Sequence, residues 1–145
     1  MACIDCHTPW DVMGSGGVYP HMQDQVEIRC EDCHGTFGAP PRWKVITGED
    51  RQTIDLSRYI SHQPLSEGER IALSSRGRPL VNVRTDAAGR SYLLGRLSGR
   101  EHDLPVITGR RTAHMIREHG RLECDACHSA WSPQCYGCHE ILDMK

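Results

Sequence analysis

The sequence predicts a mostly irregular fold, with short helices at four cysteine motifs and a small β-hairpin region between them. Two observations support this expectation. The eight cysteines fall into four C-x-x-C pairs near the two ends of the 145-residue chain, and a histidine follows each pair. Hydrophobic residues make up 38% of the chain, which is thin for a protein that builds its core from side chains alone. We therefore expect a bound group to fill part of the interior.

The four motifs read CIDCH, CEDCH, CDACH and CYGCH. Their cysteines are Cys3 and Cys6, Cys30 and Cys33, Cys124 and Cys127, and Cys135 and Cys138. Their histidines are His7, His34, His128 and His139. Because only nine residues of the chain are histidine, the chance odds of one after every pair are on the order of one in 100,000. C-x-x-C-H is the signature of covalent haem c attachment.

The spacing within each motif suits that chemistry. Each cysteine sulfur can add to a vinyl group of haem, and two intervening residues let both sulfurs reach the two vinyl groups on one porphyrin edge. The adjacent histidine then lies under the ring, where it can bind iron as the proximal ligand. We expect four covalently attached haems c, each with its iron.

Zinc and disulfides are the two alternatives for a chain with this many cysteines. Four C-x-x-C pairs could form two zinc sites of four thiolates each, but zinc would leave the four following histidines as a coincidence. Disulfides explain the pattern less well, because closely spaced C-x-x-C pairs are more often redox or metal motifs than structural links.

The distal ligands are expected among the histidines outside the motifs. These could fill all four distal positions with one to spare, which favours bis-histidine haems and electron transfer over catalysis at an open iron. They are His21, His62, His102, His114 and His119. Which of the five is not a ligand, and which pairs with which haem, stays open. Methionine is the competing ligand, but Met22 and Met115 beside candidate histidines more simply pack against a porphyrin.

The motifs divide one expected domain, residues 1–145, into three parts. Residues 1–41 would hold haems 1 and 2, and residues 122–145 would hold haems 3 and 4. Residues 42–121 form a haem-free connector with fourteen arginines and one lysine against nine acids. Arginine suits pairing with haem propionates, although a solvated basic surface explains any single arginine equally well.

Strands are predicted within the connector. Pro79–Val83 and Ser91–Leu97 flank the turn TDAAGR, and Ser98–Gly99 forms a second turn that leads into a further short strand.

Helices are predicted for Leu65–Leu73 and Thr112–His119. The first begins at a capping box, in which Ser66 is the cap and Glu69 follows three residues later.

Several classes of protein are disfavoured. No segment approaches 18 consecutive apolar residues, so we expect no membrane span. No binding motif or interleaving of basic and aromatic residues suggests nucleic acid as a partner. The sequence also shows no export signal, so we interpret the chain as a mature form, an excised piece or a gene fragment.

The stretches CIDCHTPWDVMGSGGVYPHMQDQVEIRCEDCHG and EHGRLECDACHSAWSPQCYGCH resemble segments of large multihaem c-type cytochromes from anaerobic and metal-reducing microbes. The resemblance implies a multihaem cytochrome c fold whose core is filled by haems, with low-potential bis-histidine irons. It implies His21, His114 and His119 as distal ligands and a location in the periplasm or at the cell surface. The expected partners are other redox proteins or extracellular electron acceptors.

The leading functional hypothesis is an electron carrier and not an enzyme. The alternative is the electron-input part or catalytic subunit of a multihaem oxyanion reductase, which requires one iron with an open distal side. A third hypothesis, by analogy with tetrahaem cytochromes that polymerise into extracellular filaments, is a homopolymer with haem–haem contacts between subunits.

Overall fold

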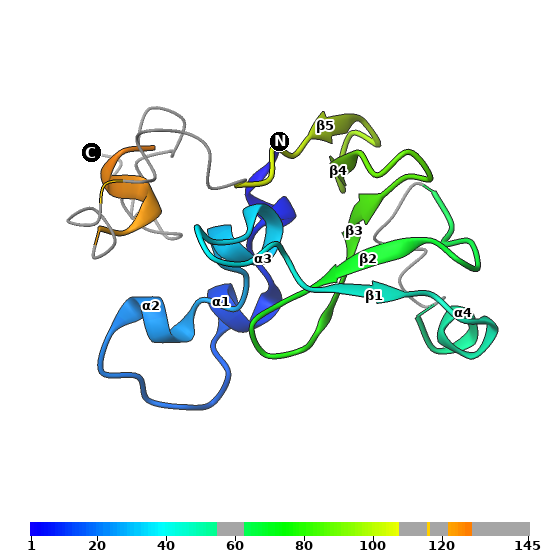
Figure 1. Ribbon diagram of the computed structural model, residues 1–145. Helices are drawn as coiled ribbons and strands as arrows, with labels where there is room; N and C mark the ends of the chain where they lie inside the picture. Colours follow the sequence, from blue (N-terminus) through cyan, green and yellow to red (C-terminus); the bar gives the residue numbers. More distant parts are fainter. Residues whose placement is uncertain (55–62, 108–115, 117–121, 129–145) are drawn as a thin grey trace, which may run out of the picture.

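An antiparallel sheet is the largest element of the computed structural model, which describes residues 1–54, 63–107, 116 and 122–128 (Figure 1). The five strands lie in chain order within the sheet. They are β1 (Trp43–Val45), β2 (Arg70–Leu73), β3 (Pro79–Thr85), β4 (Ser91–Leu94) and β5 (Glu101–Asp103). Each strand pairs antiparallel with the next, and the connection from β1 to β2 contains α4 (Gly48–Ile54).

The strands predicted in the connector are confirmed. β3 covers the Pro79–Val83 candidate, and β5 follows the turn predicted at Ser98–Gly99. β4 is shorter than the Ser91–Leu97 candidate because the chain turns at Gly95, which exchanges backbone hydrogen bonds with Gly99 and Arg100. The complete sheet is larger than the small hairpin region that we expected, since it also contains β1 and β2.

The helix predicted at Leu65–Leu73 is wrong. The capping signal is present, because the Ser66 N–H donates to the Glu69 carboxylate at 2.8 Å and the Glu69 N–H donates to the Ser66 carbonyl at 3.2 Å. These bonds close a turn that leads into β2. A register shift between Ile71 and Ala72 lets two consecutive apolar residues be buried, which imitates a helical pattern. The other predicted helix, Thr112–His119, lies almost wholly outside the described residues.

Both faces of the sheet bury apolar side chains. One cluster joins the sheet to the N-terminal part of the chain and contains Ile28, Cys33, Ala72, Leu80, Val83 and Leu93. The other lies on the side of the β1–β2 connection and contains Ile46, Leu65, Ile71 and Val81. The connector therefore has a small core of its own side chains.

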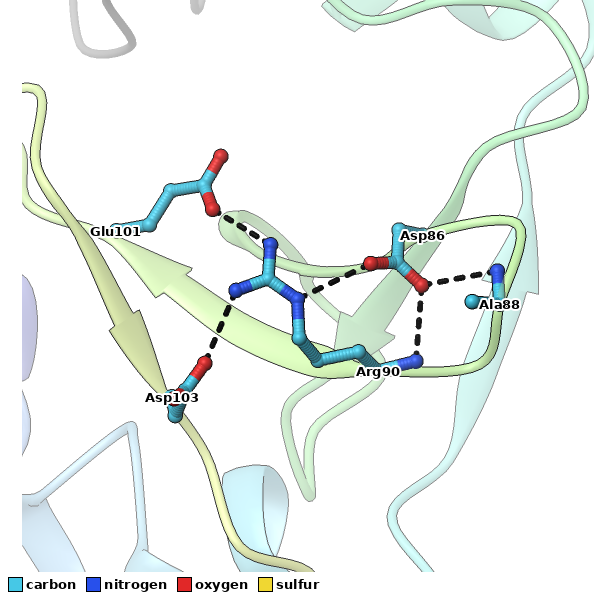
Figure 2. Close-up of polar contacts among 5 residues, drawn as sticks. All are labelled: Asp86, Ala88, Arg90, Glu101 and Asp103. Carbon is cyan, nitrogen blue, oxygen red and sulfur yellow. Dashed lines mark hydrogen bonds and ion pairs between the residues drawn. The ribbon is translucent and has the colours of Figure 1, made fainter.

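One arginine ties the β3–β4 turn to β5, as Figure 2 shows. The guanidinium of Arg90 donates to Asp86 at 3.1 Å, to Glu101 at 2.6 Å and to Asp103 at 3.0 Å. It also lies 5.0 Å from the ring centroid of Tyr92. These bonds raise the pKa of Arg90 and lower that of Asp86. This arginine is therefore held by acids of the protein itself.

Other connector arginines fasten the sheet to the N-terminal part, residues 1–41. Arg78 forms an ion pair with Glu27 at 3.0 Å and lies 4.3 Å from the ring centroid of Trp10. Arg76 donates to the backbone carbonyl of Asp24 at 2.7 Å. Arg78 and Arg76 thus link the connector to residues 1–41. Within the described ranges, no helix is long and apolar enough to cross a membrane.

Candidate functional site

The three cysteine motifs that the structure describes share one local geometry. They begin the 3₁₀ turn η1 (Cys3–Asp5), the helix α3 (Cys30–His34) and the 3₁₀ turn η5 (Cys124–Ala126). In the first and third motifs, the histidine N–H donates to the carbonyl of the first cysteine, at 2.8 Å and 2.9 Å. The two cysteines and the histidine of each motif therefore lie within one short helical turn.

The fourth motif lies outside the described residues. So do three of the five candidate distal histidines. These residues are Cys135, Cys138, His139, His62, His114 and His119.

An aspartate between the cysteines caps the first two turns. The Asp5 carboxylate accepts the Ala2 N–H at 2.6 Å, and the Asp32 carboxylate accepts the Arg29 N–H at 3.0 Å. A carboxylate at the start of a helical turn also interacts favourably with the unpaired N–H groups there. Gly35 then ends α3 with a φ of +76°, and a Cβ at this position would lie 2.7 Å from the Ala39 carbonyl oxygen. Only glycine suits such a close approach.

The first two motifs are fastened to the sheet. Asp5 is buried, and its second carboxylate oxygen accepts the Arg96 N–H at 2.7 Å in the β4–β5 turn. Cys33 is part of the core cluster that includes β2, β3 and β4 residues. The His34 carbonyl accepts the Ile107 N–H at 2.8 Å. The positions of these motifs therefore depend on residues far along the chain.

Cysteines of the three described motifs lie near enough to affect one another's pKa values. The Cys124 thiol donates a hydrogen bond to Cys30, and Cys6 lies close enough to Cys30 and Cys33 to influence them electrostatically. Burial, with a smaller effect of neighbouring cysteines, raises the pKa of Cys33 to about 12 and that of Cys124 to about 11. Reactive cysteines of oxidoreductases and proteases have lowered pKa values. These thiols are therefore poorly suited to disulfide exchange or nucleophilic catalysis.

The histidines of the first two motifs have different partners for Nδ1. Nδ1 of His34 lies 2.8 Å from the Pro105 carbonyl oxygen, so Nδ1 is the donor and Nε2 remains for another partner. Nδ1 of His7 faces a carboxylate oxygen of Asp11 at 3.7 Å, which is ion-pair range and longer than a hydrogen bond. A histidine that ligates a metal characteristically binds a carbonyl or carboxylate through its other nitrogen.

The two described distal candidates differ in accessibility. His21 is exposed and directly precedes α2 (Met22–Gln25). His102 is on β5 opposite Leu93, and its Nε2 is buried with no hydrogen-bond partner among the described residues. A Cβ placed on Gly95 would lie 3.6 Å from that nitrogen. A haem iron could reach Nε2 of His102 only if the β4–β5 turn moved.

The motif residues fit haem better than they fit a bare metal ion. Within the described residues, no group of three or more His, Cys, Asp or Glu side chains is arranged to hold a metal ion. Haem brings four nitrogen ligands of its own, so the protein needs only two sulfurs for attachment and one imidazole on each side of the ring. Each described motif offers the sulfurs and one imidazole on a single turn.

Sequence reasoning missed three residues that support the motifs. Asp11 lies four positions after His7, a spacing that places the two side chains on one helical face and could have been noticed. Asp5 could have been recognised as a cap from its place in the motif. Pro105 acts through its backbone carbonyl from a distant segment, and no sequence pattern marks it.

No protein-family model, curated protein or solved structure matches this chain. Its function is therefore argued from the motifs and their geometry.

Proposed function

We propose that the chain is an electron-transfer protein that carries four covalently attached haems c with histidine on both sides of each iron. The observation that carries this proposal is the fourfold C-x-x-C-H pattern, together with the single helical turn that three of the four motifs form. The cysteines would hold the porphyrin edges, and the histidines that follow them would be the proximal ligands. Bound haem would supply an iron that alternates between the ferric and ferrous states.

The distribution of exposed apolar side chains supports the proposal. Of the eleven large apolar residues that are exposed in the described part of the chain, seven lie within residues 1–41, around the first two motifs. They are Met1, Ile4, Trp10, Val12, Met13, Val18 and Phe37. A porphyrin is a flat apolar group, and exposed apolar side chains near its attachment sites could lie against it.

The geometry of the β4–β5 turn also reduces the number of candidate distal ligands from five to four. His102 faces the turn, so it is the candidate that we propose to leave out. The four others, His21, His62, His114 and His119, equal the number of haems. This assignment favours an electron carrier over a reductase with an open iron. We propose other redox proteins or extracellular acceptors as partners, and the periplasm or cell surface as the location.

The first experiment is a haem count on the purified chain. Intact mass and a pyridine haemochrome assay should give four haems per chain, and a Cys3→Ala/Cys6→Ala variant should give three. Zinc is measured in the same samples, because a chain with zinc and no haem contradicts the proposal. EPR then separates the two haem functions: four low-spin haems indicate an electron carrier, whereas one high-spin haem indicates an open iron and favours the reductase.

A further inference from the structure

The buried carboxylate beside His7 is held in a fixed position. Asp11 belongs to α1 (Pro9–Met13), which begins with Pro9 after Thr8. One carboxylate oxygen accepts the Thr8 N–H at 3.1 Å, and the other accepts the Glu27 N–H at 2.8 Å. The Asp11 side chain is 5% exposed, whereas that of His7 is 48% exposed. The carboxylate is therefore rigid, and the imidazole beside it is open on another side.

The Asp11 carboxylate lies next to the His7 imidazole. The neighbouring Glu27 is paired with Arg78 at 3.0 Å. In the described part of the chain, His7 is the basic side chain within ion-pair distance of Asp11, with Nδ1 at 3.7 Å from the carboxylate oxygen. His34 has a neutral carbonyl in the corresponding place. The first motif thus differs from the second by a nearly buried negative charge next to its histidine.

We propose that Asp11 is a positioning residue for His7: its carboxylate keeps the proton on Nδ1, reserves Nε2 for iron, and lowers the reduction potential of the first haem. This inference rests on the proposed function. A negative charge beside an axial imidazole stabilises the ferric state, which has one more positive charge than the ferrous state. The charge acts at short range and from a nearly buried position, so solvent screens it little.

Three variants test the role of the charge. Asp11→Asn removes it, and Asp11→Glu keeps it. Asp50→Asn is the matched control, because Asp50 caps α4 by accepting the Thr47 N–H at 3.1 Å, just as Asp11 caps α1 at Thr8. The two aspartates share the pattern T-x-x-D. Circular dichroism of all three variants shows whether the fold is kept.

The first measurement is the set of four haem potentials by spectroelectrochemistry. Asp11→Asn should raise one potential so that its ferric-to-ferrous ratio at a fixed electrode potential falls about tenfold, which corresponds to about 59 mV for one electron. Asp11→Glu and Asp50→Asn should leave that potential near its original value. In the Cys3→Ala/Cys6→Ala background, which lacks the first haem, Asp11→Asn should move none of the three remaining potentials. If Asp11→Asn and Asp50→Asn act alike, the inference is wrong.

The second measurement needs no haem. ¹⁵N NMR of the haem-free chain reports which nitrogen of His7 carries the proton, and we expect Nδ1 in the wild type with a shift toward Nε2 in Asp11→Asn. A proton on Nε2 in the wild type overturns the inference. A chain that carries no haem refutes the proposed function instead, and the position of the proton still decides whether Asp11 orients His7.

Discussion

The carboxylate of Asp5 accepts the backbone N–H of Arg96 at 2.7 Å, although the two residues lie 91 positions apart. The same side chain caps its own turn by accepting the Ala2 N–H at 2.6 Å. Asp5 is therefore both a local cap and the link between the first cysteine motif and the β4–β5 turn.

Replacement of Asp5 by alanine should destabilise the chain by about 3 kcal/mol, because it removes a helix cap and leaves the Arg96 N–H without its acceptor. Urea unfolding followed by circular dichroism gives the free energy of unfolding. Asp32→Ala is the matched control, since Asp32 caps α3 in the same way by accepting the Arg29 N–H. That variant should lose only about 1 kcal/mol. Equal losses would mean that the bond to Arg96 contributes nothing.

The two described distal candidates should respond differently to substitution. His21→Ala should convert one haem to the high-spin form, because the exposed imidazole of His21 is available to an iron. His102→Gln should leave all haems low-spin, since Nε2 of His102 is buried against the turn at Gly95. EPR of the ferric protein, with cyanide added to detect an open iron, distinguishes them. A high-spin haem in His102→Gln alone would reverse the assignment of the spare histidine.

The cluster around Arg90 should make stability depend on pH in a defined direction. Its hydrogen bonds lower the pKa of Asp86 below the ordinary value of 3.8. The contribution of this contact is therefore fully present above that value and is lost as the pH falls through the lower pKa of the folded state.

Arg90→Lys tests this dependence, because lysine keeps the charge and loses the planar fork that reaches three carboxylates (Figure 2). The wild type should be more stable than the variant in urea at neutral pH. The difference should shrink as the pH is lowered below about 3.8. A difference that grows in acid would contradict the role of Asp86.

Local features of the fold were predictable from the sequence, and long-range ones were not. The turns between β3, β4 and β5 follow from the residue types at 85–90 and 98–99, which act over a few positions. Ser66 and Glu69 form the capping interaction that their spacing predicts, but this interaction closes a turn before β2 and does not begin a helix. The capping contacts alone do not determine whether the chain continues as a helix or as a strand, and here pairing with β1 and β3 made it a strand.

In the candidate site, too, the local features were predictable from the sequence and the long-range contacts were not. The cysteines and the histidine of each motif are adjacent in sequence, so the pattern alone marks them as candidates. The ion pairs of Arg78 with Glu27 and of Arg90 with Glu101 join segments that only the folded chain brings together, so the sequence does not reveal them. The burial of His102 Nε2 likewise depends on the pairing of β5 with β4, which the residues around His102 do not predict.

The position of Cys33 has a consequence for the order of events during biogenesis. Its side chain is packed among β2, β3 and β4 residues, and so is shielded from any enzyme that must bring haem to the sulfur. For a haem-bearing chain, attachment at this cysteine therefore has to precede closure of the sheet. The bond formed there would make the second haem a covalent part of the hydrophobic core.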